Sequence, residues 1–124
     1  MRVNSDSIHN GADQFFQWSA VDPTDGSVNV VFYDRRGDPR NRMQTVVLAR
    51  SSDGAKSFAN YAWTSNAFEA GGVFFGDYTG LAAHGGRVYG VWTEKPPGQP
   101  APVPPKRLGT VVKVGLADFS VPGH

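Results

Sequence analysis

The chain has 124 residues, a formal net charge of +1, no cysteine and 40% hydrophobic residues, and charged residues make up only 19%. Its length suits one modest hydrophobic core, and its low charge is not typical of a disordered chain. No basic stripe indicates binding to nucleic acid or to an anionic membrane surface. The longest apolar runs, such as Val28–Tyr33, are too short to span a bilayer, and disulfides and thiolate chemistry are excluded.

The first half of the chain is predicted to form four short β-strands. Aromatic and β-branched residues cluster between turn signals at 23–26 and 52–54, and a polar loop covers 37–41. No stretch shows a sustained helical period. The expected strands are 13–21, 28–33, 45–50 and 58–64.

The second half is predicted to repeat this order, and it ends before a fourth strand. Gly85 and Gly86 mark a turn between the first two strands, and a proline-rich surface insertion covers 95–108. The expected strands are 74–83, 88–93 and 110–116.

An internal repeat relates the two halves. Trp18–Asp34 aligns with Tyr78–Glu94 without a gap at an offset of 60 residues, and Thr45–Asp53 aligns with Thr110–Asp118 at an offset of 65. Units of four antiparallel strands that recur in this way are typical of β-propeller blades. We therefore expect an all-β fold in one partial domain, with blades at about 13–66 and 72–120. The alternative is a free-standing β-sandwich of about seven strands, which would not repeat as matched sets.

Two blades cannot close a propeller ring. Each blade buries its faces against its neighbours, so an isolated pair should expose apolar sheet faces. We expect an incomplete ring that associates with further blades of a parent propeller or with other copies of itself. An isolated chain should then form oligomers or aggregates.

Residues 51–58, Ser-Ser-Asp-Gly-Ala-Lys-Ser-Phe, resemble the Asp-box of the sialidase-like (BNR-repeat) propeller superfamily. The matching positions are Ser51, Asp53, Ser57 and Phe58, and the turn falls between the third and fourth expected strands. We expect the Asp53 carboxylate to accept backbone N–H bonds across the turn and Phe58 to fill the blade core. Asp53 is therefore interpreted as structural. Ala55 replaces the usual glycine and would be strained if the position requires a positive φ.

A second stretch resembles the segment that carries the nucleophilic tyrosine of sialidases. Residues 76–81, Gly-Asp-Tyr-Thr-Gly-Leu, are followed by Trp-Thr-Glu at 92–94. The resemblance implies Tyr78 as the nucleophile and leaves Asp77 open between a ligand or calcium contact and a backbone cap. A phenol needs a neighbouring base near neutral pH. Neither Glu69 nor Glu94 occupies the place of that base in sialidases. The alternative interpretation is that Tyr78 packs in the blade as an aromatic residue, like Trp18.

The resemblance also implies an arginine clamp for the carboxylate of a sialic acid, because a guanidinium pairs with a carboxylate through two bonds. Arg42 lies 11 residues before Asp53, in the place expected for one such arginine, with Arg40 beside it. Arg36 belongs to the same charged loop, 34–40. The alternative interpretation of the segment 34–40 is a solvated loop with weak ion pairs.

Two functions remain open at this point. One is an exo-sialidase or related glycoside hydrolase that acts on terminal sialic acids. The other is a non-catalytic propeller that binds a glycan or a protein. No cofactor is expected, and His9 and His84 have no partner at ligand spacing for a metal. Residues Met1–Asp6 lack the apolar core of a signal peptide, so secretion or transport to the periplasm, which we expect, would need a signal upstream.

Overall fold

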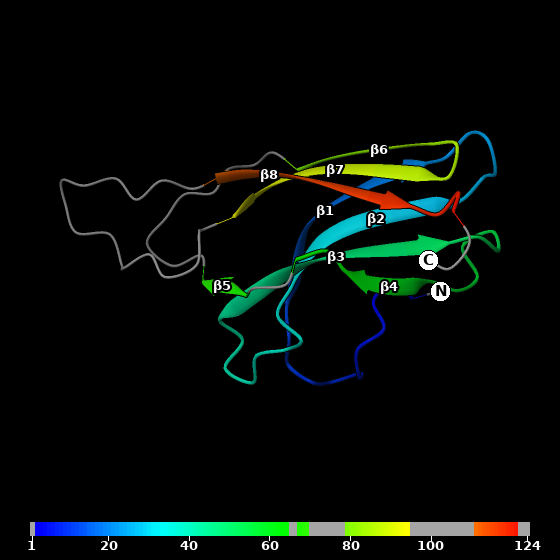
Figure 1. The fold of residues 1–124 in the computed structure, drawn as a ribbon. Helices are drawn as coiled ribbons and strands as arrows, with labels where there is room; N and C mark the ends of the chain where they lie inside the picture. Colours follow the sequence, from blue (N-terminus) through cyan, green and yellow to red (C-terminus); the bar gives the residue numbers. More distant parts are fainter. Residues whose placement is uncertain (1, 65–66, 70–78, 95–110, 122–124) are drawn as a thin grey trace.

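The computed structural model describes residues 2–64, 67–69, 79–94 and 111–121. These ranges are all-β, with two antiparallel sheets (Figure 1). They contain no helix, and so none that is long and apolar enough to cross a membrane. The strands are β1 (Gln14–Val21), β2 (Val28–Asp34), β3 (Met43–Ser51), β4 (Ala59–Ala62), β5 (Phe68–Glu69), β6 (Gly80–His84), β7 (Arg87–Glu94) and β8 (Val111–Asp118).

The first sheet follows the chain order β1-β2-β3-β4, and the two-residue β5 pairs with the beginning of β3. Its two central strands, β2 and β3, are rich in valine and aromatic residues and are buried on both faces. Val31 pairs with Leu48 and points to one face, whereas Phe32 pairs with Val47 and points to the other. These two strands therefore form the centre of the molecule.

A β-bulge interrupts β1. The pairing with β2 shifts between Phe15 and Trp18, and Phe16 has a φ of 53°. The left-handed region is unusual for an aromatic residue and is found where a bulge re-aims a strand. The bulge gives a physical reason for the imperfect alternation of the predicted strand at 13–21.

The second sheet has the order β6-β7-β8. Gly85 and Gly86 join β6 to β7 in a two-residue turn, with φ of 63° and 81° respectively. Such a turn needs a positive φ at both positions, which glycine adopts without steric cost. A side chain at Gly86 would also lie 3.1 Å from the backbone nitrogen of Ser120.

The internal repeat is present in the strand order, but the strand registers differ between the copies. Val31 pairs with Trp18, whereas its aligned counterpart Val91 pairs with Gly80, two positions beyond the residue aligned with Trp18. The difference arises because the Gly85–Gly86 turn is shorter than the loop 22–27 in the first copy. A shift of two residues keeps each side chain on the same face of its sheet.

The pairing between the second and third strands also differs between the two copies, by one residue. Asp34 pairs with Thr45 in the first sheet, and Glu94, the counterpart of Asp34, pairs with Val111. The sequence alignment matches Thr45 to residue 110 instead. The strand pairing therefore corrects the second half of the predicted alignment by one position.

The second sheet lies over one face of the first, so the molecule has two layers (Figure 1). Trp92 on β7 is buried in the core between the layers and lies against Trp63, with ring centroids 5.1 Å apart. Gly115 makes room for it, since a Cβ there would come within 2.4 Å of the Trp92 ring. The side of the second sheet that carries Trp92 is called its inner face below. The core also contains Val31, Tyr33, Val46 and Phe68.

The opposite face of the first sheet has a smaller core of its own. Phe32, Val47 and Ala49 are buried there, and Val3 and Phe58 pack against them. Phe58 comes from the turn after β3, and Val3 comes from the N-terminal segment (residues 2–13). Both faces of the first sheet are therefore at least partly covered by the chain itself.

Candidate functional site

The turn after β3 is built around one carboxylate. Asp53 Oδ1 accepts the backbone N–H groups of Lys56 at 3.0 Å and Ser57 at 2.9 Å. The Ser51 hydroxyl donates to Asp53 Oδ1 at 2.8 Å, and the Ser57 hydroxyl donates to Asp53 Oδ2. The turn joins β3 to β4, and Phe58 packs on the core beside it. The hydrogen bonds expected from the sequence are present.

The electrostatics of this turn favour a structural role for Asp53. Hydrogen bonds lower the pKa of its carboxyl to about 2, the largest contribution coming from the Ser57 hydroxyl and the next from the Ser57 backbone N–H. A carboxylate held in this way stays ionised at neutral pH, and its lone pairs are taken by the turn. It is therefore unsuited to acid or base catalysis.

Ala55 occupies a left-handed position in the same turn. Its φ is 67°, and the preceding Gly54 has a φ of 74°. Its backbone N–H donates to the Ser51 hydroxyl at 3.0 Å, so the turn holds the residue in this conformation. The strain that the sequence predicted for an alanine at this place is present.

The charged loop before β3 is ordered by a second aspartate. The Asp38 carboxylate accepts the backbone N–H groups of Arg40 at 3.0 Å, Arg42 at 3.1 Å and Met43 at 2.8 Å. These bonds lower the pKa of Asp38, with the Met43 N–H contributing most, and the charge of Arg40 adds to the effect. The side chains of both arginines are exposed. The loop thus has a fixed backbone that carries two guanidinium groups.

Arg40 and Arg42 line one open surface pocket of about 390 Å³, together with Asp38 and Met43. The structure therefore brings together two of the three arginines that the sequence singled out. The Asp-box-like turn lies at the other end of β3, a strand of nine residues that spans roughly 30 Å. The turn helps to fix the strand, but it does not contact the pocket.

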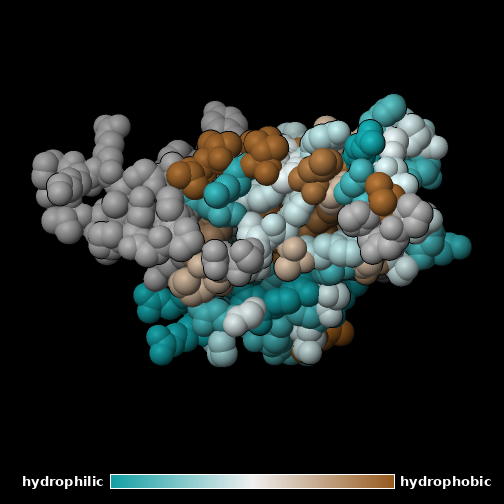
Figure 2. Space-filling model, in the orientation of Figure 1, coloured by the Kyte–Doolittle hydropathy of each residue, from teal (hydrophilic) through white to brown (hydrophobic). Residues whose placement is uncertain are grey.

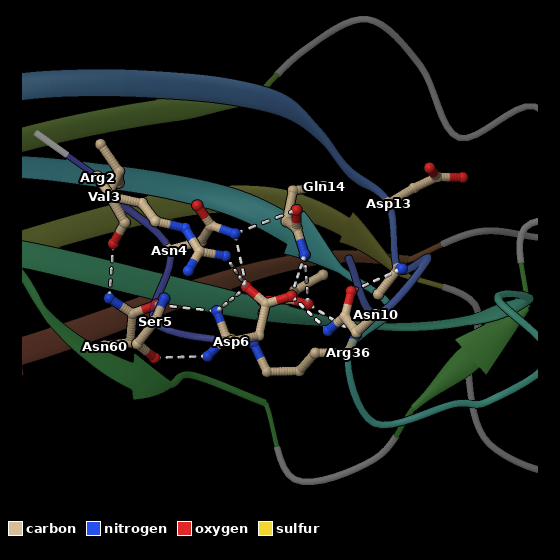
Figure 3. Close-up of polar contacts among 12 residues, drawn as sticks. Arg2, Val3, Asn4, Ser5, Asp6, Asn10, Asp13, Gln14, Arg36 and Asn60 are labelled. Carbon is tan, nitrogen blue, oxygen red and sulfur yellow. Dashed lines mark hydrogen bonds and ion pairs between the residues drawn. The ribbon is translucent and has the colours of Figure 1, made fainter. Parts of the chain in front are cut away.

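Arg36, the third arginine, is bound by other residues of the chain (Figure 3). Its guanidinium donates to Asp34 at 2.5 Å, to the Ser5 hydroxyl at 2.7 Å and to Asn60 at 2.9 Å. It also lies 3.8 Å from Asp6, in an ion pair. These contacts tie the N-terminal segment to β2 and β4 through Arg36.

Asp6 is the partner of Arg36 in the N-terminal segment. Burial raises the pKa of its carboxyl, but hydrogen bonds from Asn10 and Asn4, together with the charge of Arg36, outweigh burial and lower it. Gln14 donates to the same carboxylate at 3.2 Å (Figure 3). The ionised form is thus the stable one, and the N-terminal segment is held by charge-assisted bonds.

Tyr33 and Glu94 lie at the same end of the sheets as the arginine loop. The Tyr33 hydroxyl donates to the Thr93 carbonyl at 2.6 Å and accepts the Thr93 N–H at 3.1 Å. Burial raises the pKa of Tyr33, so this phenol stays protonated. Glu94 is buried and accepts the indole N–H of Trp92 at 2.7 Å. These groups are used as structural hydrogen-bond partners.

The proposed nucleophile Tyr78 and its neighbour Asp77 lie outside the described residues. Thr79, the next residue along the chain, has a side chain that hydrogen-bonds the Tyr33 hydroxyl. In the part of the chain that the structure describes, no group of three or more His, Cys, Asp or Glu side chains is placed to hold a metal ion.

Asp22 is a structurally important residue that the sequence analysis missed. It is fully buried in the loop between β1 and β2, yet its carboxylate accepts N–H groups from the other sheet, Gly85 at 3.2 Å and Gly86 at 2.7 Å. Bonds from Thr24, chiefly its hydroxyl, and from the two glycines hold the pKa of Asp22 far below its ordinary value, against the effect of burial. The only sequence signal is the turn pattern Asp-Pro-Thr-Asp-Gly, which does not reveal a contact between sheets.

Comparisons with protein-family models, curated proteins and solved structures gave no match for this chain. The assignment of function therefore depends on the site geometry and on the motifs described above.

Proposed function

We propose that the chain is part of a sialidase-like propeller and that it binds an acidic glycan at the pocket of Arg40 and Arg42. The observation that carries the proposal is the presence of both guanidinium groups in one pocket, on a loop whose backbone is ordered by Asp38. The Asp-box-like turn and the internal repeat support the propeller assignment.

The chemistry of the pocket suits a sugar carboxylate. A guanidinium offers a planar pair of N–H donors that matches the two oxygens of a carboxylate, and ordering the loop in advance reduces the entropic cost of binding. Among the described residues that line the pocket, Asp38 is the one acid, and three backbone N–H groups already bind its carboxylate. The charge of these described lining residues therefore favours an anion.

Binding without catalysis is the function that the described residues support best. The hydrolase alternative assigns the nucleophilic attack on the anomeric carbon to Tyr78, and it requires a base beside the phenol. Glu94, the one glutamate whose side chain is described, is buried and hydrogen-bonded to Trp92. A fluorogenic sialoside separates the two functions: hydrolysis that disappears in Tyr78→Phe would establish the enzyme and contradict the non-catalytic form of the proposal.

The binding proposal is tested with 3′-sialyllactose and lactose as a charged and a neutral probe. NMR titration of the chain should show binding of the sialylated sugar only, and the binding should weaken as salt is added. The double variant Arg40→Ala, Arg42→Ala should weaken it by about 10- to 100-fold. Arg87→Ala is the matched control, because Arg87 is also an exposed arginine but lies on the other sheet, paired with Asp118.

Equal binding of lactose would contradict the proposal, and so would unchanged affinity of the double variant. A thermal melt of each variant checks that the loop substitutions leave the fold intact.

A further inference from the structure

One face of the second sheet is apolar and exposed. The outer face, as we call it, is the side of β6, β7 and β8 that points away from Trp92. Figure 2 shows hydrophobic residues gathered along this part of the molecule. Its large members and their exposed fractions are Tyr89 46%, Val91 42%, Val112 69%, Val114 72% and Leu116 55%.

Strand register shows that these residues form one continuous surface. Tyr89 pairs with Leu116, Val91 with Val114, and Thr93 with Val112. Cross-strand partners in an antiparallel sheet point to the same face, and Ala82, paired with Tyr89, extends the surface onto β6. The outer face therefore crosses all three strands of the sheet.

The corresponding face of the first sheet shows what this kind of surface requires. Val91 is aligned with Val31 by the repeat, and Val31 is buried under the second sheet, against Trp92. In the first copy, this face is thus covered by another β-sheet. The outer face of the second copy has the same alternation of apolar residues but no sheet over it in the described structure.

We propose that in the isolated chain the outer face, which would lie against a further blade in a propeller ring, is a dimer interface on which a second copy packs, outer face to outer face. A sheet face can pack on another copy of itself through a two-fold axis, which is the commonest symmetry of soluble oligomers. The only other large apolar sheet face that the described residues form, around Phe32 and Val47, is already covered by Val3 and Phe58. The outer face is therefore left with its own counterpart as a partner.

The N-terminal segment is held over that other face by several bonds. Asn60 donates to the Val3 carbonyl at 2.8 Å and accepts the Ser5 N–H at 3.0 Å, and Arg36 pairs with Asp6. A partner that replaced Val3 there would first have to break these contacts. Head-to-tail assembly is thus disfavoured relative to the two-fold dimer.

Charge and area both permit the dimer. The large residues of the outer face are uncharged, and Arg87 and Asp118 at its edge pair with each other at 3.4 Å. With a formal net charge of +1, two chains repel each other only weakly. Apolar patches of this kind cover about 300–600 Å². Two of them would bury on the order of 1,000 Å², the lower limit of specific interfaces, so the dimer should be weak and concentration-dependent.

Sedimentation velocity over a range of protein concentrations tests the proposal. The wild-type chain should shift from one-chain to two-chain mass as concentration rises. Val114→Lys should weaken this association by about tenfold or more, because a lysine would be desolvated at the interface. Val21→Lys is the matched control, since Val21 is also a strand valine, 58% exposed, on the other sheet.

Three outcomes would overturn the proposal: a wild-type monomer at every concentration, assemblies larger than two chains, or equal association of the two lysine variants. Thermal melts show whether both variants are folded, and the milder Val112→Thr should weaken association by a smaller factor. A crosslink gives a second readout. The chain has no cysteine, so Val114→Cys should be joined to its partner by a bismaleimide that spans about 10 Å, the distance between packed sheets, and Val21→Cys should not.

Discussion

The two sheets contain copies of one repeat, but they differ in how they are covered. The first sheet is buried on both faces at β2 and β3, under the second sheet on one side and under Val3 and Phe58 on the other. Within the described ranges, the second sheet is covered on its inner face alone, and its outer face is apolar. The comparison teaches that the repeat determines which residues point to a face, while the presence of a neighbouring layer determines whether that face is buried.

The two copies also differ at their turns. The first copy uses a loop with Asp22 and an Asp-box-like turn with Asp53, whereas the second has a two-glycine turn after β6 and an Asp118-Phe119-Ser120 turn after β8. Asp118 accepts the Ser120 N–H at 2.9 Å, which retains one element of the larger turn. At Asp22, a side chain of the first copy therefore accepts hydrogen bonds from backbone N–H groups of the second copy.

The largest expected effect comes from removing the contact between the layers. Trp92→Ala should lower the free energy of unfolding by about 3–5 kcal/mol, because it empties the core between the sheets. Tyr89→Ala on the same strand points to the outer face and should cost much less. Urea unfolding of the two variants measures the difference. Equal losses would show that the layers do not depend on Trp92.

A smaller effect on stability is expected from removing the bonds between Asp22 and the Gly85–Gly86 turn. Because the folded pKa of Asp22 is lowered, its ionised form stabilises the fold fully above the unfolded value of about 3.9. That contribution is lost as pH falls from about 4 toward the folded pKa. Asp22→Asn should therefore be less stable at neutral pH and should lose less stability on acidification.

Melting temperatures of wild type and Asp22→Asn between pH 7 and pH 2 check this prediction. Asp53→Asn is a comparison variant: Asp53 also has a lowered pKa, so this variant should likewise lose less stability on acidification, but Asp53 contacts only its own turn. A pH profile of Asp22→Asn parallel to that of the wild type would contradict the role of Asp22.

Strand positions could be predicted from the sequence because each strand is a local pattern. The expected strands at 28–33 and 88–93 lie within β2 and β7, and the strand at 45–50 lies within β3. Local turn chemistry was equally informative, as the bonds around Asp53 show. The propeller ring and its function stay predictions, because they concern further blades and ligands.

Long-range contacts could not be predicted from the same patterns. The Asp22 carboxylate binds a turn more than 60 residues away in sequence, and Arg36 gathers partners from the N-terminal segment and β4. Nothing in the sequence near Arg36 separates it from Arg40 and Arg42, since all three lie in one charged loop. The fold determines that Arg36 pairs with Asp34 and Asp6, and that Arg40 and Arg42 line the same pocket.

The smallest expected effect concerns the strain in the turn that only the first copy has in full. Ala55→Gly should raise the free energy of unfolding by about 1 kcal/mol, because glycine adopts the φ of 67° without the clash of a Cβ. Gly54→Ala is the mirror control: it places a Cβ at a φ of 74°, where space is open, and should lower stability by a similar amount. Urea unfolding measures both. If Ala55→Gly destabilised the chain, the entropy that glycine adds to the unfolded state would outweigh the relief of strain, and the alanine would be the better residue for this turn.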